Sequence, residues 1–296
     1  MTRKWVNVLR HGILSMCLVL MSSAAFAEIE SDLSGAMRST IPPPKLKVSS
    51  WLLMDAATGL TLAGHRADTP VEPASLTKLM TAYVVFREIE RGTVKLDDVV
   101  LVSEKAWRSE GSRMFIEAGD KVQIKNLLMG LIVQSGNDSA VALAEHIAGS
   151  EEGFADLMNQ TAAELGMANS HFVNSAGMPH PDHYTTARDV TLLTRAIIDQ
   201  QPDHYAMYAI REFTWNDITQ KNRNPLLGRD SSIDGVKTGH TRSAGYCLVG
   251  SAARDGMRLI GTVIGAKSNR ERADAVYSLL RFGFAAYEHH DLYSAG

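Results

Sequence analysis

The sequence predicts an α+β protein in which one antiparallel sheet is built from both ends of the chain and a helical region is inserted between them. Three observations predict this fold class: a strand pair near the start, a long helical middle, and a strand triplet with a closing helix at the end. Strands grouped apart from helices, with short turns between them, are typical of α+β domains. The 296 residues suffice for one large domain or two modest ones.

The composition narrows the class of protein. The chain is 45% hydrophobic and 21% charged, which is normal for a soluble globular protein. The formal net charge of -3 argues against nucleic acid as a partner, because there is no basic excess to neutralise phosphates. The two cysteines, Cys17 and Cys247, offer no disulfide framework, since the first lies in a segment that we expect to be removed.

Residues 1–27 have the pattern of a secretory signal peptide. An apolar run, Ile13 to Met21, precedes the small-residue site Ala25-Phe26-Ala27, and three basic residues come before the run: Arg3, Lys4 and Arg10. The run is too short to span a bilayer well, so we expect cleavage after Ala27 rather than an uncleaved anchor. Residues 28–46 are polar and contain Pro42-Pro43-Pro44 near their end, so we interpret them as a lead-in arm.

The mature chain begins with a hairpin and a helix. Val48–Asp55 and Leu60–Gly64 are predicted strands, and Ala57-Thr58-Gly59 forms the turn between them. A buried helix is predicted to start at Ser75, because an apolar run follows with no breaker until Gly92.

The middle of the chain is predominantly helical. Residues 93–125 are mixed and turn-rich, and the predicted helices are Ile124–Ile132, Asp138–Ile147, Phe154–Leu165 and Ala187–Asp199. Residues 167–186 form a long irregular loop, and such loops usually have a function. The loop's histidines have no metal-ligand spacing, so we interpret them as ordinary loop residues: His171, His180 and His183.

The periodicity changes near Ile233. Three strands are predicted at Ile233–Lys237, Gly245–Ala252 and Leu259–Ile264, with a hairpin turn at 254–256. Arg270–Tyr287 is the closing helix. Cys247 is interpreted as a small buried strand residue.

Three short motifs lie at element boundaries. Ser75-Leu76-Thr77-Lys78 stands at a helix start, Ser135-Gly136-Asn137 in a loop between helices, and Lys237-Thr238-Gly239 at the end of a strand. Residues three apart share a helix face, so the Ser75 hydroxyl and the Lys78 amine are expected side by side at a helix N-terminus, which favours an anionic oxygen. The three motifs in this order are a signature of serine acyl transfer.

Acyl transfer gives each motif residue a role. Ser75 is predicted to be the nucleophile, Lys78 its proton acceptor when neutral, and Ser135 the relay to the leaving amine. Asn137 would hold a peptide carbonyl or orient Lys78, and Lys237 would favour a neutral Lys78 and attract a carboxylate. The strand residues Thr238, Gly239 and His240 are expected to pair with an extended substrate. The backbone N–H groups of Ser75 and His240 would form the oxyanion hole. This chemistry needs no metal and no cofactor.

With these motifs the sequence resembles the low-molecular-mass penicillin-binding proteins, and more narrowly the D-alanyl-D-alanine carboxypeptidases of the penicillin-binding protein 5 type. The resemblance runs from about Val48 to Phe284. The further matching segments are Glu72-Pro73-Ala74, Asn174-Ser175-Ala176-Gly177, Tyr184-Thr185-Thr186-Ala187-Arg188-Asp189, Asn222-Arg223-Asn224, Asp234-Gly235 and Gly256-Met257-Arg258-Leu259-Ile260.

The resemblance implies a serine β-lactamase/transpeptidase-like fold and a periplasmic enzyme. Such an enzyme removes the terminal D-alanine from peptidoglycan pentapeptide through an acyl-enzyme, and penicillin acylates the same serine. It also implies that Arg272 lies near the substrate's terminal carboxylate, with Arg270 as a close competitor. The expected partners are therefore peptidoglycan stem peptides and β-lactams.

The family usually continues into an all-β domain and a membrane-binding helix. We expect a peptidase domain at 47–288 and a short tail at 289–296. No strong membrane anchor is expected in the chain as given, which is either a natural single-domain member or incomplete.

Other functions stay open at this point. A D,D-endopeptidase uses the same chemistry, and a β-lactamase is a further possibility. Glu164 is the nearest candidate for a deacylating carboxylate, but it lacks the Glu-x-x-Leu-Asn pattern, so slow release of β-lactams is expected. An inactive peptidoglycan-binding relative is the non-enzyme alternative, and it would have no need of Lys78.

Overall fold

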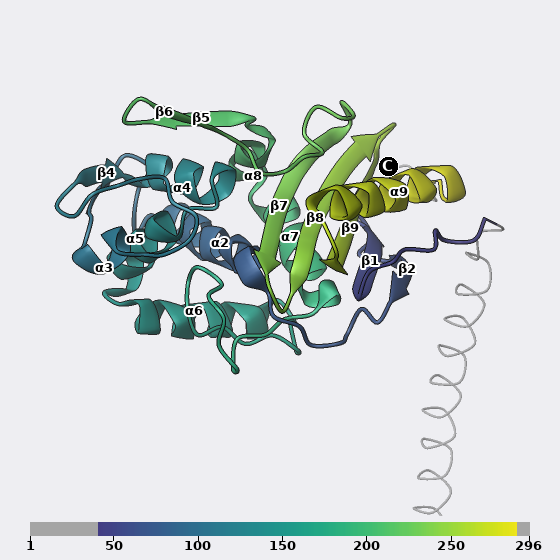
Figure 1. Ribbon diagram of the computed structural model, residues 1–296, viewed down its shortest axis with the longest axis horizontal. Coiled ribbons are helices and arrows are strands. Elements are labelled where there is room, and N and C mark those ends of the chain that lie inside the picture. The colour runs from purple at the N-terminus through teal and green to yellow at the C-terminus, as the bar shows by residue number, and fades with distance from the viewer. Residues whose placement is uncertain (1–40, 289–296) are drawn as a thin grey trace, which may run out of the picture. The chain divides into compact units, whose positions relative to one another are not determined.

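The computed structural model describes residues 41–288, which contain a five-stranded antiparallel sheet flanked by helices (Figure 1). The strand order is β2-β1-β9-β8-β7. The sheet's strands are β1 (Ser50–Asp55), β2 (Thr61–His65), β7 (Ile233–Thr241), β8 (Gly245–Arg254) and β9 (Met257–Ala266). This confirms the predicted α+β class with a sheet built from both ends of the chain. The predicted signal peptide and the 289–296 tail lie outside the described residues.

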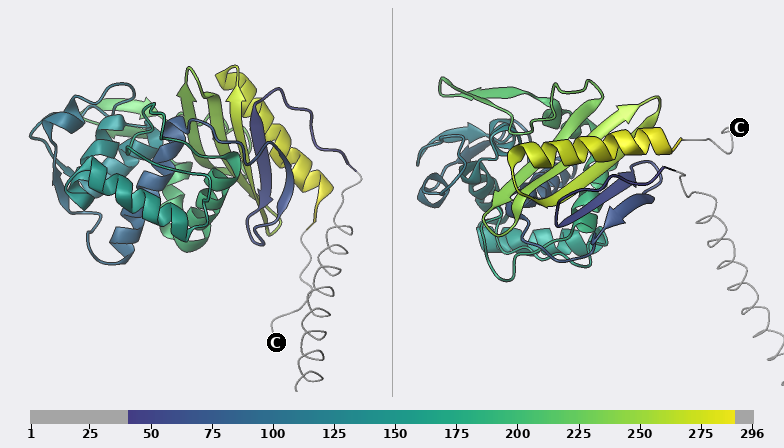
Figure 2. Two further views of the ribbon diagram at one scale, coloured as in Figure 1. Left: turned by 90° about the horizontal axis from the view of Figure 1, so that it is seen from below. Right: turned by 45° about the vertical axis from the view of Figure 1, so that its right-hand side comes forward.

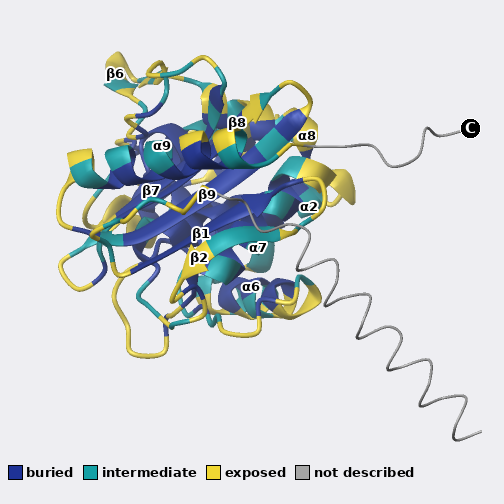
Figure 3. Cartoon of the chain, turned by 90° about the vertical axis from the view of Figure 1, so that its right-hand side faces the viewer, coloured by how far each residue is buried: buried dark blue, intermediate teal, exposed yellow. Residues whose placement is uncertain are grey.

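The two faces of the sheet carry separate cores. Adjacent residues of a strand point to opposite faces, and accordingly Leu52 and Leu53 belong to different buried clusters. Helix α9 (Asn269–Ala286) covers the Leu53 face, and α7 (Ala187–Gln200) covers the Leu52 face (Figure 2). The strands between these layers are mostly buried (Figure 3).

The helical region lies on the side of α7 and packs around the central helix α2 (Thr77–Glu90), ten of whose residues are buried. The other helices are α3 (Glu104–Trp107), α4 (Ile124–Val133), α5 (Asn137–Ala148), α6 (Glu151–Glu164) and α8 (Pro202–Tyr205), with short 3-10 turns η1 (Ala74–Leu76) and η2 (Ala206–Ala209). Across residues 41–288, no helix combines the length and hydrophobicity needed to cross a bilayer.

Two small two-stranded antiparallel sheets were not predicted. β3 (Val99–Leu101) pairs with β4 (Lys121–Gln123), and β5 (Glu212–Trp215) pairs with β6 (Ile218–Lys221). These strands have three or four residues each and are largely exposed, so they lack the apolar alternation that identifies a strand. The turn between β5 and β6 uses left-handed Asn216 and Asp217, two residue types that tolerate positive φ.

Two predicted boundaries near the motifs were wrong. The predicted helix at Ser75 begins as the 3-10 turn η1, and α-helical geometry starts only at Thr77. The strand that was predicted to end at Lys237 continues to Thr241, because residues 238–241 pair in register with β8 down to Gly245. Lys237-Thr238-Gly239 therefore lies inside an edge strand rather than at its end.

Candidate active site

Ser75 lies in η1, directly before α2, and is half-buried. The preceding residue, Ala74, has a left-handed backbone with φ of 50°. A non-glycine residue in this region is strained by roughly 1–3 kcal/mol and often marks a functional site. Gly177 lies against it, so close that a Cβ on Gly177 would be 1.8 Å from the Ala74 carbonyl oxygen. The turn that carries Ser75 is therefore held against the loop at residues 174–178.

Lys78 is buried, and its amine is surrounded by oxygen atoms. Its Nζ lies 3.2 Å from Ser75 Oγ, 2.7 Å from Asn137 Oδ1 and 2.5 Å from the Ala176 carbonyl oxygen. Burial, helped by the positive charge of Arg223 and opposed by Asp138, lowers the pKa of Lys78 from 10.5 to about 7. An appreciable fraction of this amine is therefore neutral near pH 7.

The geometry around Lys78 suits a proton acceptor. A neutral amine has two N–H donors and one lone pair. The oxygens of Asn137 and Ala176 only accept, so they take both donors and leave the lone pair for the Ser75 hydroxyl, which can donate. Ser75 Oγ, at 3.2 Å, is within hydrogen-bond reach of this nitrogen, as a general base requires.

Ser135 lies in the short connection between α4 and α5 and is buried, with a left-handed φ of 62°. Its Oγ accepts a hydrogen bond from Lys237 Nζ at 2.8 Å, and this leaves its own proton free to donate. Burial, together with the charges of Lys78, Arg223 and Arg272, holds the pKa of Lys237 well below its ordinary value. Lys237 and Ser135 thus form a second amine–hydroxyl pair in the site.

Asn137 is the first residue of α5, and the structure favours one of its two predicted roles. Its Oδ1 accepts from Lys78, while its Nδ2 donates to the Glu110 carbonyl oxygen at 2.6 Å and contacts Met178 Sδ at 3.5 Å. All three contacts are internal to the protein. In this structure Asn137 orients Lys78.

Strand β7 forms the opposite wall. It is an edge strand of the sheet, and its Gly239 lies against η1, where a Cβ would be 3.2–3.3 Å from Leu76 and Ala74. His240 is exposed, and its ring stacks on Tyr246 with centroids 4.1 Å apart. Thr238, Gly239 and His240 therefore lie along a free strand edge beside the nucleophile, where an extended peptide can pair.

The two arginines that the resemblance places near the substrate lie in different surroundings. Arg272 is buried, and it donates to the carbonyl oxygens of Gly239 and Cys247 and to Asn269 Oδ1. Arg272 thus supports β7 from behind and adds positive charge. The Arg270 side chain is 91% exposed and lies 3.6 Å from Asp274 on the surface of α9.

Sequence reasoning missed several contributors to the site. The Ala176 carbonyl carries no side-chain signal, although the long loop that contains it was predicted to be functional. Arg223, from the matching segment Asn222-Arg223-Asn224, is exposed, and its guanidinium makes no hydrogen bond or ion pair within residues 41–288. Its charge contributes to lowering the pKa of both Lys78 and Lys237.

Buried Asp138 is a further contributor. Its carboxylate accepts hydrogen bonds from the backbone N–H groups of residues 114–116, which fixes the loop next to Asn137.

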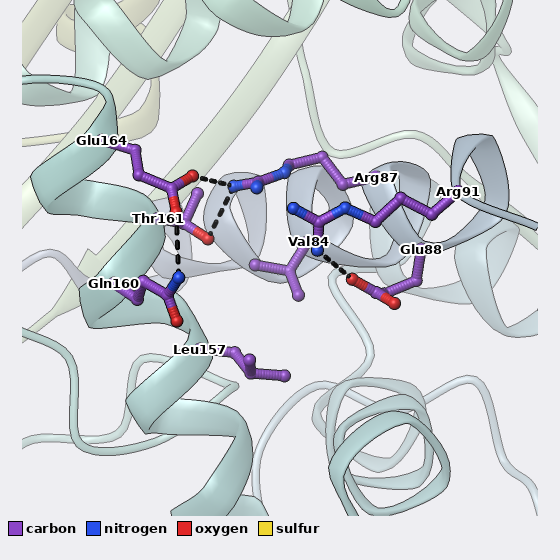
Figure 4. A pocket seen from close by; sticks show the side chains of 8 residues that line it. All are labelled: Val84, Arg87, Glu88, Arg91, Leu157, Gln160, Thr161 and Glu164. Atoms are coloured by element: carbon purple, nitrogen blue, oxygen red, sulfur yellow. Dashed lines mark hydrogen bonds and ion pairs between the residues drawn. The ribbon is translucent and has the colours of Figure 1, made fainter. Parts of the chain in front are cut away.

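Glu164 is engaged away from Ser75. Figure 4 shows it in a surface pocket between α2 and α6, where it pairs with Arg87 at 2.7 Å and accepts from Gln160. Arg87 lies about 13 Å farther along α2 than Lys78, at 1.5 Å per residue. Glu164 is thus not placed to activate water at Ser75.

His183 is the buried histidine of the loop. Its Nδ1 accepts from the Val173 N–H, so its Nε2 carries the proton and donates to Thr77 Oγ1 at 2.8 Å. Burial and the charges of neighbouring histidines lower its pKa to about 4. No cluster of His, Cys, Asp or Glu within residues 41–288 has an arrangement that could hold a metal ion. His183 therefore joins the loop to the first turn of α2.

Comparisons with known proteins agree with this geometry. Residues 37–268 match the peptidase family described as D-alanyl-D-alanine carboxypeptidase. D-alanyl-D-alanine carboxypeptidase DacC of Escherichia coli is 42% identical over 91% of this chain and 69% of its own length. The crystal structure of D-alanyl-D-alanine carboxypeptidase DacD from Francisella tularensis has a TM-score of 0.84 at 36% identity, covering 88% of this chain and 77% of that chain. Penicillin-binding protein D2 from Listeria monocytogenes, solved in an ampicillin-bound form, has a TM-score of 0.76 at 27% identity, covering 82% and 100%.

Proposed function

Because the chain belongs to the D-alanyl-D-alanine carboxypeptidase family, we propose that it removes the terminal D-alanine of a peptidoglycan stem peptide through an acyl-enzyme on Ser75. The observation that carries the proposal is the position of Lys78. Its buried amine has both donors occupied and its lone pair beside the Ser75 hydroxyl. A peptidoglycan-binding protein without catalysis would have no need of a lysine in this state.

Acylation begins when Ser75 Oγ attacks the carbonyl carbon between the two D-alanine residues. The Ser75 proton passes to Lys78 Nζ, and a tetrahedral intermediate forms with negative charge on the former carbonyl oxygen. The backbone N–H groups of Ser75 and His240 stabilise this oxyanion. The loss of one such donor typically slows acyl transfer by about 100- to 1,000-fold, so the spacing of the two groups matters.

The intermediate collapses when the C–N bond to the terminal D-alanine breaks. The leaving nitrogen needs a proton, and the Ser135 hydroxyl supplies it. Lys237 Nζ, 2.8 Å from Ser135 Oγ, returns a proton to that oxygen. Lys78 passes the proton that it took from Ser75 to the deprotonated Lys237 and is neutral again. Water then attacks the Ser75 ester while Lys78 accepts its proton, and that proton returns to Ser75 Oγ as the ester C–O bond breaks and the shortened peptide leaves.

The terminal carboxylate of the substrate needs a cation near β7. Lys237 provides one when its amine, which lies beside Ser135, is protonated. Exposed Arg223 has its guanidinium unpaired among the described residues, whereas the donors of Arg272 are engaged with Gly239, Cys247 and Asn269. We therefore favour Arg223 over Arg272 and Arg270 as the substrate's carboxylate partner.

β-Lactams are expected to acylate Ser75 and leave slowly. The Listeria neighbour binds ampicillin and cefotaxime in its solved structures. In this chain Glu164 is paired with Arg87 away from Ser75, which supports slow deacylation rather than β-lactamase activity.

The place of action follows from the predicted export signal. The basic start, apolar run and Ala25-Phe26-Ala27 site support secretion with cleavage after Ala27. The proposed substrate, peptidoglycan, lies outside the inner membrane. We infer that the mature enzyme works in the periplasm, where trimming of stem peptides influences cell-wall synthesis and cell shape.

Release of D-alanine from diacetyl-Lys-D-Ala-D-Ala tests the carboxypeptidase assignment. Wild-type protein should release it, and Ser75→Ala should not. A cross-linked muropeptide dimer serves as the competing substrate. Cleavage of the dimer without release from the linear peptide would replace the proposal by a D,D-endopeptidase.

A further inference from the structure

A carboxylate close to the nucleophile has no part in the reaction described above. Glu72 precedes Ser75 by three residues, and its side chain reaches the end of β7. Its Oε2 accepts a hydrogen bond from Thr241 Oγ1 at 2.6 Å and a second, short one from Ser243 Oγ. The Thr241 hydroxyl in turn accepts from the Ala244 N–H at 3.0 Å. One carboxylate oxygen of Glu72 therefore binds two residues at the turn between β7 and β8, Thr241 and Ser243.

The Glu72–Thr241 pair joins the two segments that supply the oxyanion hole. Thr241 directly follows His240, whose N–H is one proposed donor, and Glu72 lies three residues before Ser75, whose N–H is the other. Within residues 41–288, the hydrogen bonds of Glu72 with Thr241 and Ser243 are the only side-chain hydrogen bonds that join the segment before Ser75 to the end of β7 or its turn. The remaining contact between these segments is van der Waals packing of Gly239 on Ala74 and Leu76.

The segment that carries Glu72 is fixed on its other side. Val71 exchanges both backbone hydrogen bonds with Thr185, at 2.8 and 2.9 Å. Because Glu72 is anchored through its neighbour, its carboxylate can set the position of Thr241 rather than follow it. Hydrogen bonds to an ionised acceptor are shorter and stronger than neutral ones, which suits this task.

We propose that Glu72 is a positioning residue that, through Thr241, sets the distance between the Ser75 and His240 N–H groups. The inference rests on the proposed acyl-enzyme function and deepens it. Oxyanion donors act only within about 2.7–3.1 Å of the developing charge. A shift of β7 away from η1 would weaken the transition state more than it weakens substrate binding.

The test compares variants at both ends of the pair. Glu72→Ala should slow acylation of Ser75 by penicillin by about 10-fold or more, less than the loss of a whole oxyanion donor. A peptide boronic acid, whose tetrahedral adduct places an oxygen in the oxyanion hole, should lose affinity in parallel. The KM for the peptide should change by less than about 3-fold, because ground-state contacts along β7 persist.

Conservative variants distinguish positioning from folding. Glu72→Gln keeps an oxygen that accepts from both hydroxyls and should retain most of the acylation rate. Thr241→Val should reproduce the defect from the other side, and Thr241→Ser should not. The double variant Glu72→Ala/Thr241→Val should be no slower than Glu72→Ala alone, because Glu72→Ala already removes the contact with Thr241. Asp68→Ala is the matched control, since it breaks the ion pair with Arg188 in the preceding stretch and should leave acylation unchanged.

The outcomes separate the inference from the function on which it rests. If wild-type protein is acylated and Glu72→Ala is acylated at the same rate, the inference is overturned and the function stands. A KM effect as large as the acylation defect, or unchanged boronate affinity, also overturns it. If wild-type protein is not acylated at all, both fail. Thr241→Val supplies the same comparison if Glu72→Ala does not fold.

Discussion

The carbonyl oxygen of Ala176 lies 2.5 Å from Lys78 Nζ, so a loop residue 98 positions away in sequence holds the proposed catalytic base. In the same loop, the Ser175 carbonyl oxygen accepts a hydrogen bond from Thr81 Oγ1, and Gly177 packs against Ala74. Ser175 is fixed from the other side by Glu151, which accepts from both its N–H and its hydroxyl. The position of the Lys78 amine therefore depends on the contacts that fix this loop.

The pH dependence of acylation should report the lowered pKa of Lys78. Only the neutral amine accepts the Ser75 proton, so the rate should rise with pH and reach half of its plateau at about 7. Rates of penicillin acylation measured from pH 5 to 9 check this. A rate that is still rising at pH 9 without reaching a plateau would show that the amine keeps the pKa of an ordinary lysine and is not the base at neutral pH.

The lowered pKa of Lys78 also affects the free energy of unfolding of the protein. The folded pKa of Lys78 lies below its unfolded value of 10.5, so the unfolded chain binds the extra proton between about pH 7 and 10.5. The contribution of this group to the free energy of unfolding should therefore increase with pH across that window. Lys78→Met removes the titrating group, and denaturant titrations at pH 7 and 9 should show a smaller rise than in wild type.

Gly177→Ala should damage both the fold and the acylation rate. The position has φ of +84°, and the new Cβ would lie 1.8 Å from the Ala74 carbonyl oxygen, so the loop must move away from Lys78. We expect acylation to slow by at least about 10-fold, as misplacement of a general base does.

Gly166→Ala is the matched control for Gly177→Ala. It has φ of +72° with nothing within 4 Å of the added Cβ, so it carries the backbone strain without the clash. Gly166→Ala should lower the free energy of unfolding by about 1–2 kcal/mol and leave the acylation rate normal. Thermal melts and penicillin kinetics compare the two variants, and equal effects would mean that the loop contact is unimportant.

Ser135→Ala should impair turnover of the peptide by about 100-fold or more, the usual contribution of a proton-transfer group. The variant also removes the oxygen that accepts from Lys237. Ser139→Ala is the control for loss of a buried hydroxyl from the same segment, because Ser139 lies four residues later in α5 and its hydroxyl has no hydrogen-bond partner among the described residues. D-Alanine release measures both, and comparable losses would argue against a relay at Ser135.

Arg223→Gln should have two separable effects. Removal of the charge should raise the pKa of Lys78, because Arg223 is one of the causes that lower it, and so move the pH midpoint of acylation upward. Loss of the proposed carboxylate partner should raise the KM for the peptide. Arg223→Lys keeps the charge and should preserve the midpoint. If Arg223→Gln changes neither quantity, Arg223 is only a surface residue.

The sequence predicted the parts of the site that depend on short patterns. Ser75 and Lys78 share a helix face because of their spacing, and Lys237-Thr238-Gly239 lies on a strand because its neighbours are apolar and β-branched. The order of strands and helices was sufficient to predict a sheet formed from both ends of the chain.

Other parts of the site depend on contacts between distant segments. The Ala176 carbonyl is a backbone group, and no residue type signals that it will meet Lys78. Arg272 was placed by likeness of position, yet its donors are taken up by Gly239 and Cys247, which only the packing of α9 on β8 reveals. Arg223 shows the reverse, since no side-chain pattern signals that its charge will contribute to lowering the pKa of both Lys78 and Lys237.

Intact-protein mass spectrometry after mixing with penicillin G tests the central claim most directly. Wild-type protein should gain the mass of one penicillin, and peptide mapping should place it on Ser75. Lys78→Met should remain unmodified over the same period, because no group then accepts the Ser75 proton. Wild-type protein without an adduct, or a Lys78→Met variant acylated at the wild-type rate, would contradict the account.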